Sequence, residues 1–389
     1  MIKYSQYFTN DKISKLFIST IGDVDVNYIL ELGIGDGALS LAALCKWPDA
    51  HVYGAEIDEN RCVALQSESI SIKYVDVLSD DDIYADNSFD LALCNPPFHK
   101  IIKNETFIQI LEKASFSQSI LLKQLSADII FVARSMIMLK DNGILALILP
   151  DGLLTRFDLK GFRKDILDSY KVEHIIQLPN KAFEKTEAKT HIVIIKKCKS
   201  QSTNIPLSQV NLEGHIDKTI YVNKTELYNR MDFSYYNQNV ILKNEIHEIS
   251  NMHICRGTYT YCDLKKMTFP YVHSKSFTHG SILINQDVKY ERNKSIAHTG
   301  DILMVRVGSR CLGRVMFVKK GSIIISDCIY KISVPQKYRY RLFKFLCSDK
   351  AQNYLHVLAH GVCAKVINKT DLVSFINQMF WIKYKDELS

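Results

Sequence analysis

The chain has 389 residues, of which 47% are hydrophobic and 23% charged, a composition typical of a globular protein with room for two cores. Its apolar runs are shorter than the roughly 18 residues of a membrane-spanning helix, and its first residues lack an apolar signal core. The ten cysteines include no C-x-x-C pair, which argues against a disulfide framework and a zinc site. We therefore expect a cytoplasmic protein that uses neither a membrane nor a metal.

The net charge of +7 is unevenly distributed along the chain. Residues 1–200 contain 23 Lys and Arg against 27 Asp and Glu, a net charge of −4. Residues 201–389 contain the remaining 26 against 15, a net charge of +11. A basic half beside a slightly acidic half indicates a polyanion-binding module next to a domain of another kind.

In chain order, the first half alternates short apolar runs with amphipathic stretches. The sequence predicts helices at 37–47 and 121–140, and strands at 27–32, 51–57, 71–77, 89–94, 144–150, 172–178 and 190–196. This alternation predicts an α/β fold of the Rossmann-like type, with a mainly parallel seven-stranded sheet. In such sheets ligands bind at the carboxyl ends of the strands.

The second half has a weaker periodicity. A polar segment at 199–206 is expected to be a linker between a first domain, residues 1–200, and a smaller domain, residues 206–389. This second domain is predicted to be α+β, with short strands at 301–307, 313–320 and 322–326 and a helix near 339–349.

A glycine-rich turn follows the first predicted strand. Glu31 ends that strand, and Gly33 and Gly35 allow a tight turn and a close approach of the backbone to a ligand. Alone, this motif is shared by sites for nicotinamide, flavin and S-adenosylmethionine (SAM). The next two strands lead to Glu56 and Asp76, which could accept hydrogen bonds from a ribose and from an adenine amino group.

The fourth predicted strand leads into Asn95, Pro96, Pro97 and Phe98. A planar amino group is a poor nucleophile, because its lone pair is delocalised into the ring. The Asn95 side-chain oxygen and the Pro96 carbonyl are two acceptors that can hold both amino hydrogens, and the prolines fix their positions. The Phe98 ring can stack on an extracted base. This pattern favours methyl transfer to a planar nitrogen, with no metal.

With these motifs, residues 3–197 resemble the gamma class of SAM-dependent N6-adenine DNA methyltransferases. The resemblance implies SAM as cofactor, with S-adenosylhomocysteine as product, and a flipped adenine as target. It implies catalytic roles for Asn95, Pro96, Pro97 and Phe98, and it assigns stacking on the adenine to Phe98 and Phe183. The cofactor contacts it implies are Tyr7, Phe8, Thr9, Glu31, Gly33, Gly35, Glu56, Ile57, Asp76, Val77 and Asn95.

The second half resembles the target-recognition domains of type I restriction specificity subunits. The similarity lies in 230–237, in 300–318 and in 360–375. It implies that the basic module binds double-stranded DNA, and we expect most of its cations to contact phosphates. The residues expected to do so are Arg306, Arg310, Arg314, Lys319 and Lys320.

These observations predict a site-specific DNA adenine methyltransferase of the restriction-modification type, for which a cognate restriction endonuclease is a candidate partner. Two alternatives remain open. One is an RNA adenine-N6 methyltransferase with a basic RNA-binding domain. The other is a non-catalytic DNA-binding subunit of a modification complex.

Overall fold

The computed structural model describes residues 11–79, 82–179, 189–211, 213–239, 248–277, 280–283, 295–308, 310–360 and 365–380. The chain forms two compact units, Met1–Asn237 (unit 1) and Gln238–Ser389 (unit 2). Each unit has its own hydrophobic clusters, so each is described by itself.

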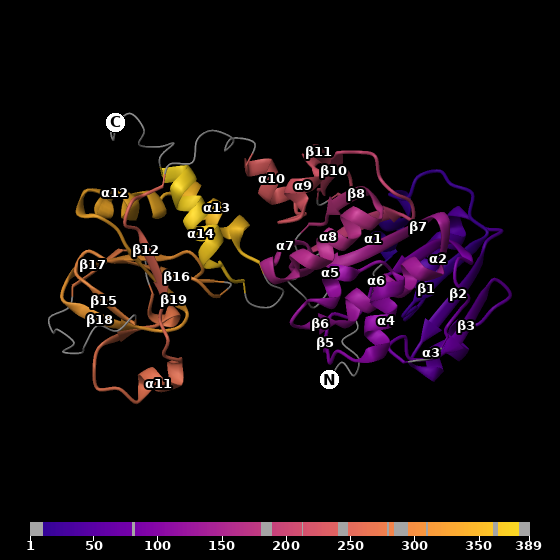
Figure 1. Ribbon diagram of the computed structural model, residues 1–389, viewed down its shortest axis with the longest axis horizontal. Helices are drawn as coiled ribbons and strands as arrows, with labels where there is room; N and C mark the ends of the chain where they lie inside the picture. Colours follow the sequence, from indigo (N-terminus) through magenta and orange to yellow (C-terminus); the bar gives the residue numbers. More distant parts are fainter. Residues whose placement is uncertain are drawn as a thin grey trace. The chain divides into compact units, whose positions relative to one another are not determined.

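Unit 1 is built on a nine-stranded sheet in the order β11-β10-β8-β9-β7-β4-β1-β2-β3 (Figure 1). The strands are β1 (Tyr28–Leu32), β2 (His51–Glu56), β3 (Ile70–Tyr74), β4 (Phe89–Cys94), β7 (Leu139–Pro150), β8 (Lys171–Gln177), β9 (Thr190–Lys196), β10 (Asn204–Val210) and β11 (Ile216–Asn223). A separate two-stranded ribbon pairs β5 (Lys100–Ile101) with β6 (Leu125–Ser126).

The five strands from β3 to β7 in the sheet order are mutually parallel. β9 is antiparallel to both of its neighbours, β7 and β8. The seven predicted strands correspond to β1–β4 and β7–β9, so the predicted α/β fold is confirmed. Parallel pairing requires crossover connections, and the helices between the strands supply them.

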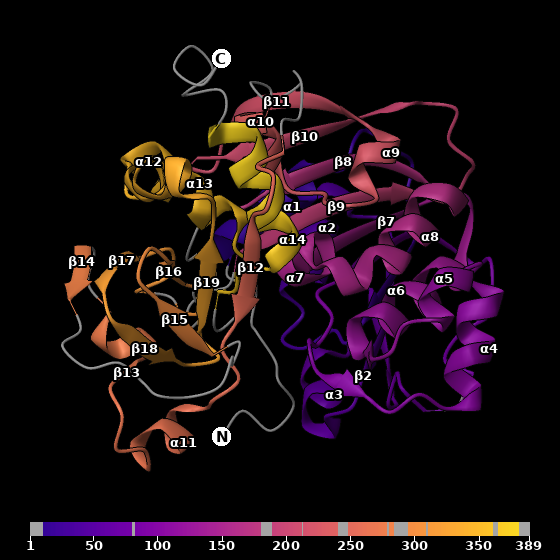
Figure 2. The same cartoon turned by 60° about the vertical axis from the view of Figure 1, so that its left-hand side comes forward.

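Helices pack against both faces of this sheet. The helices of unit 1 are α1 (Asp11–Ser19), α2 (Ala38–Lys46), α3 (Glu59–Leu65), α4 (Glu105–Lys113), α5 (Ser117–Ile120), α6 (Ala127–Met138), α7 (Asp151–Thr155), η1 (Phe157–Leu159), α8 (Lys160–Ser169), α9 (Lys224–Leu227) and α10 (Phe233–Asn239). Alternate strand residues face opposite layers: Leu145 and Leu147 pack in the cluster that contains α6 and α8, and Ala146 and Ile148 in the one with α1 and α2. Figure 2 shows α4, α5, α6 and α8 together on one face.

The helix predicted at 121–140 is shorter in the structure. α6 begins at Ala127 because Leu125 and Ser126 pair with β5. α6 is followed directly by β7, in which Asn142 has the left-handed conformation at φ 65°.

The boundary between the units lies later than the sequence pattern indicated. The segment 199–206, expected to be a linker, leads directly into β10, which pairs in parallel with β8. β11 then pairs antiparallel with β10. The structure therefore divides the chain after Asn237. Both strands extend the sheet of unit 1 beyond the seven strands expected.

Unit 2 is smaller and mixes strands with helices. Its strands form a five-stranded sheet, β12-β19-β16-β17-β14, and a three-stranded sheet, β13-β18-β15. They are β12 (His253–Arg256), β13 (Tyr271–Val272), β14 (Gly280–Leu283), β15 (Ile296–His298), β16 (Ile302–Val305), β17 (Val315–Lys320), β18 (Ser322–Ile325) and β19 (Ile329–Ser333). Its helices are α11 (Tyr261–Lys265), η2 (Ser274–Ser276), α12 (Gln336–Leu346), α13 (Asp349–Leu358), α14 (Lys369–Phe375) and the π-helical η3 (Ile376–Phe380). The expected α+β architecture is present.

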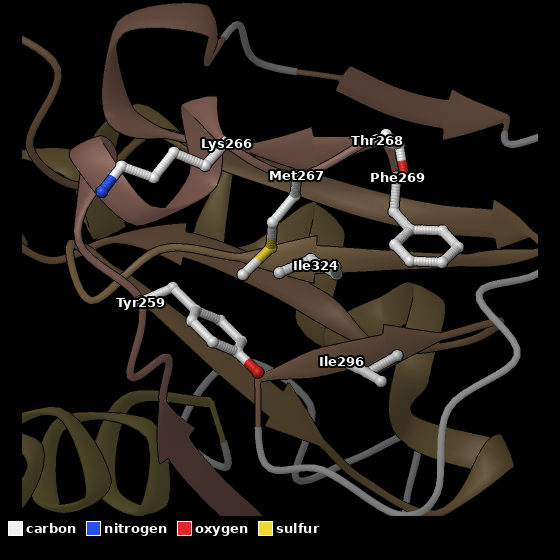
Figure 3. A pocket seen from close by; sticks show the side chains of 7 residues that line it. All are labelled: Tyr259, Lys266, Met267, Thr268, Phe269, Ile296 and Ile324. Atoms are coloured by element: carbon white, nitrogen blue, oxygen red, sulfur yellow. The ribbon is translucent and has the colours of Figure 1, made fainter.

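A cavity of about 210 Å³ lies in unit 2, next to β15 and β18 (Figure 3). Its lining residues are Tyr259, Lys266, Met267, Thr268, Phe269, Ile296 and Ile324. None of the seven is an acid, so this cavity does not have the composition expected of the cofactor site. In the part of the chain that the structure describes, no helix is both long and apolar enough to cross a bilayer.

Candidate functional site

The strand register brings the predicted site residues to one edge of the sheet. Glu31 on β1 lies beside Gly54 on β2 and Leu93 on β4. Glu56 lies beside Tyr74, the last residue of β3. Because these strands are parallel, Glu31, Glu56, Asp76 and Asn95 all lie at the same carboxyl edge, where ligands of α/β sheets bind.

The glycine-rich turn connects β1 with α2. Gly33 and Gly35 have φ values of 73° and 58°, a region that favours glycine. The amides of Gly33 and Ile34 both donate to the Ala55 carbonyl, which ties the turn to β2. Among the described residues, a Cβ at position 35 would meet the Gly33 carbonyl oxygen at 3.9 Å and Arg61 Nη1 at 4.0 Å, which are ordinary van der Waals distances.

Glu31 is buried at the end of β1, with 3% of its surface exposed. Its carboxylate accepts hydrogen bonds from the Ser40 amide, at 3.1 Å, and from the Ser40 hydroxyl. Ser40 is in the first turn of α2, where backbone amides lack helical partners, so Glu31 caps the helix that follows the turn. Burial raises the pKa of this carboxyl to about 8, and the nearby Glu56 charge acts in the same direction.

Glu56, 2% exposed, reaches from the end of β2 to the glycine turn. Its Oε2 accepts from the Gly35 amide at 2.9 Å, and its Oε1 accepts from the amides of Ile57 and Asp58 at 3.0 and 3.1 Å. A carboxylate has about four acceptor positions, so capacity remains for a ligand hydroxyl. Glu56 therefore organises the turn and can also take part in binding.

Asp76 and its neighbours follow β3, the last strand in the sheet order. Asp76 is exposed two residues beyond the end of β3, and its Oδ1 accepts from the Leu78 amide at 2.9 Å. Val77 is buried and Ile57 half-buried, so both apolar residues predicted to contact the cofactor lie beside the predicted acids.

Asn95 opens the loop that follows β4. Asn95, Pro97 and Phe98 are half-buried and Pro96 is buried. The far end of the loop is held by a hydrogen bond of 2.9 Å from the Ala127 amide to the His99 carbonyl. The predicted catalytic motif thus lies between a central strand and the start of α6.

Cys94, directly before the motif, is fully buried, and its thiol lies 3.6 Å from the Leu32 carbonyl. Burial, with the nearby carboxyls of Glu31 and Asp128, raises the pKa of this thiol well above its usual range. No sequence motif indicated Asp128. Buried at the start of α6, it accepts from the Ser126 hydroxyl, and burial raises its pKa to about 6.

Four predicted contacts lie outside the described residues. They are Tyr7, Phe8 and Thr9 of the first motif and the predicted stacking residue Phe183. The described residues on both sides of the segment with Phe183 are Pro179 and Lys189, and next to them the Leu178 amide donates to the Thr190 carbonyl at 3.0 Å.

The segment 230–237, which the sequence placed at the start of the DNA-binding domain, belongs to unit 1. Asp232 is fully buried and makes two hydrogen bonds with Arg230, of 2.8 and 3.1 Å. The amide of Met231 donates to the Leu154 carbonyl at 2.9 Å. The similarity to specificity subunits at this segment is therefore no guide to a DNA-reading surface, because its charged side chains pair inside unit 1.

The five predicted DNA-binding cations of unit 2 differ in their surroundings. Arg306 is half-buried and donates to the Asp327 carbonyl at 3.2 Å, and Arg314 donates to the Phe277 carbonyl at 3.0 Å. Arg310, Lys319 and Lys320 are exposed. The hairpin that carries them closes through the hydrogen bond from the Gly313 amide to the Val305 carbonyl. Within the described ranges, no group of three or more His, Cys, Asp or Glu side chains could hold a metal ion.

The chain is similar in sequence to proteins of a known family. The profile of the family described as N-6 DNA Methylase matches residues 3–268. The chain is 25% identical over 177 residues to the Type II methyltransferase M.AccI of Acinetobacter calcoaceticus, covering 45% of this chain and 33% of that protein. It is 31% identical over 97 residues to Ribosomal RNA large subunit methyltransferase G of Colwellia psychrerythraea, covering 22% and 24%.

Among solved structures, the type IIG restriction endonuclease BpuSI has a similar fold, with a TM-score of 0.54 at 13% identity. The similarity covers 96% of this chain and 59% of that one. The chain thus matches about a quarter to three fifths of the length of these relatives.

Proposed function

Because the chain belongs to the N-6 DNA methylase family, we propose that it transfers a methyl group from SAM to the N6 amino group of an adenine flipped out of duplex DNA. The observation that carries the proposal is the shared edge of the sheet, where the Glu31–Gly35 turn and Glu56 lie beside the strand that leads into Asn95. A cofactor site and a site for a planar amino group are thereby adjacent.

The glycine turn and the acids have the chemistry to bind SAM. The glycines of the turn carry no side chain that would block a ligand's approach to the backbone, and Glu56 has acceptor capacity left for ribose hydroxyls. Asp76, exposed at the same edge, can accept a hydrogen bond from the adenine amino group of SAM. When bound, SAM supplies an electrophilic sulfonium methyl group, and S-adenosylhomocysteine is the product.

Asn95 and Pro96 prepare the target nitrogen. The Asn95 side-chain oxygen and the Pro96 carbonyl accept the two N6 hydrogens, which favours a tetrahedral nitrogen with its lone pair directed at the methyl group. The new N–C bond forms as the C–S bond breaks, and the nitrogen then releases one proton to water. Phe98 stacks on the flipped adenine, and Phe183 is proposed as a second stacking residue.

Unit 2 is the proposed DNA-binding module. Its exposed Arg310, Lys319 and Lys320 are available for phosphates, which is where most protein–DNA hydrogen bonds are made. The relation to M.AccI, a Type II methyltransferase, favours a restriction-modification context with a cognate endonuclease as partner.

Methyl transfer from labelled SAM tests this function. We expect label in the adenine N6 position of unmethylated duplex DNA. The variant Asn95→Ala should lose at least about 100-fold in kcat, since it removes one of two acceptors, while its affinity for SAM stays within about twofold. An N95A variant as active as the wild type would contradict the role of the motif.

A second candidate function is methylation of RNA, because the chain resembles a ribosomal RNA methyltransferase over 97 residues. The same assay therefore includes RNA and protein substrates. Label in RNA but not in DNA would replace the proposed substrate and leave the proposed chemistry in place.

A further inference from the structure

The residues 230–236 touch both ends of the connection between β8 and β9. On one side, the Lys189 ammonium donates to Asp232 Oδ2 at 3.4 Å. On the other, the Ser234 amide and hydroxyl donate to Gln177 Oε1 at 3.1 and 2.8 Å. Gln177 is the last residue of β8, and Lys189 directly precedes β9. One short segment therefore fixes the positions of two strand ends.

These contacts continue to the end of β7. The Lys189 ammonium also lies 3.5 Å from Asp151 Oδ1, and the His191 Nε2 lies 3.0 Å from the same oxygen. The Asp151 amide donates to the Lys189 carbonyl at 2.9 Å. Asp151 follows Pro150, the last residue of β7, and β7 is the neighbour of the strand that leads into Asn95. The contact chain therefore ends on the strand next to the one that leads into Asn95.

The network is buried and its charges are matched. Asp151 and Asp232 are the two acids, Lys189 and Arg230 the two bases, and no more than 5% of either acid's side chain is exposed. Burial by itself would raise the pKa of both acids, but the adjacent cations hold both below their usual range. A buried charge that loses its partner is strongly destabilising to its surroundings, so the ends of β7 and β9 depend on Asp232 for their geometry.

We propose that Asp232, with Ser234, is a positioning residue for methyl transfer, which holds the ends of β7, β8 and β9 where they border the target base. This inference rests on the proposed function, because it assumes that the edge beside Asn95 receives the base. Under this proposal, residues 230–236 have a role in unit 1, the catalytic unit. This role differs from the recognition of DNA that their resemblance to specificity subunits implies. Asp232 touches neither substrate nor cofactor in this role.

The variants Asp232→Asn and Ser234→Ala test the proposal in the full chain. D232N keeps the side-chain size but removes the charge that Lys189 and Arg230 share, whereas S234A removes one hydrogen bond to Gln177. We measure kcat and KM for DNA, the Kd for SAM and the Tm. We expect kcat/KM for DNA to fall about 10- to 100-fold in D232N and several-fold in S234A, with the Kd for SAM within about twofold of the wild type.

Tyr228→Phe is the matched control. It removes the hydrogen bond of 2.6 Å from the Tyr228 hydroxyl to Asp168, which lies away from these strand ends. It should keep wild-type kcat/KM. Wild-type kcat/KM in both D232N and S234A would overturn the proposal. A parallel loss of SAM affinity and methyl transfer would also overturn it, since that is the result of general structural damage.

If D232N does not fold, S234A decides between these outcomes. The activity of the wild-type protein distinguishes a failure of the proposed function from a failure of the positioning role. A wild type that methylates RNA and not DNA refutes the proposed substrate, and the variants are then compared on RNA. A wild type that methylates DNA, with D232N and S234A equally active, refutes only the positioning role.

Discussion

Two glutamates at the ends of adjacent strands have different hydrogen-bond partners. Glu31 and Glu56 are both buried, but among the described residues Glu56 accepts three backbone hydrogen bonds, whereas Glu31 accepts its bonds from Ser40. Burial raises the pKa of Glu31 to about 8, so its carboxyl is largely protonated at neutral pH before a ligand binds. A positively charged ligand group at this edge would favour its ionised form.

This raised pKa makes stability depend on pH. A folded-state pKa of about 8 against an ordinary value of 4.5 means that the folded protein holds a proton that the unfolded chain releases between these pH values. The contribution is complete below pH 4.5 and is lost as the pH rises towards 8. The variant Glu31→Gln cannot ionise, so between pH 5 and 8 the wild type should lose up to about 1.4 kcal/mol per pH unit relative to E31Q.

Urea unfolding of both proteins at pH 5, 6, 7 and 8, without SAM, measures this difference. Parallel stability curves for the two proteins would show that Glu31 is ionised in the folded state throughout this range.

At the scale of elements, the β16–β17 hairpin carries two kinds of cation. Some donate hydrogen bonds within unit 2, and others are exposed to solvent. Arg306 and Arg314 donate to carbonyls within unit 2, and Arg306 also lies 5.3 Å from the Tyr330 ring. Lys319 and Lys320, at the end of β17, are exposed. The arginines therefore have a structural role in the hairpin, and the two lysines are the better candidates for phosphate contacts.

The double variant Lys319→Ala/Lys320→Ala should weaken binding to every duplex DNA sequence. Each lost phosphate contact lowers the slope of log K against log salt by about 0.9, so we expect the slope to fall by up to about 2. Fluorescence anisotropy with labelled duplexes over a range of salt concentrations measures it. Lys164→Ala, an exposed lysine on α8 of unit 1, is the control. An unchanged slope in the double variant would exclude this face as a phosphate-binding surface.

At the scale of the whole molecule, the sequence predicts the central strands well and the domain boundary poorly. β4 contains the apolar run 91–94 and β9 the apolar run 192–195, each typical of a buried strand. β10 contains Pro206, and most residues of β11 are exposed, so neither strand has a clear periodicity. β10 is specified by its pairing with β8, a partner that is distant in the chain, and β11 by its pairing with β10.

The candidate site was likewise predictable from the sequence only in part. The positions of Glu31, Glu56 and Asn95 follow from strand order and motif, which local sequence contains. The partners of Asp232 do not, because Lys189 lies 43 residues away and no local pattern links them. A buried Arg-x-Asp pair can be recognised in the sequence, but its place in the fold depends on which strand ends it contacts.

The two units have separate cores, and this predicts that their ligands stabilise them separately. The clusters around Leu145 and Ala146 lie in unit 1, and the cluster around Val318 lies in unit 2. A ligand stabilises only the unit whose folded state binds it, so SAM at 100 times its Kd should stabilise unit 1 by about 2.7 kcal/mol. Hydrogen exchange followed by mass spectrometry should then show slower exchange at β1, β2 and the glycine turn, with unchanged exchange at β16 and β17. Slower exchange of equal size in both units would mean that the two cores unfold together, and that SAM binding is coupled through the fold to unit 2, the proposed DNA-binding module.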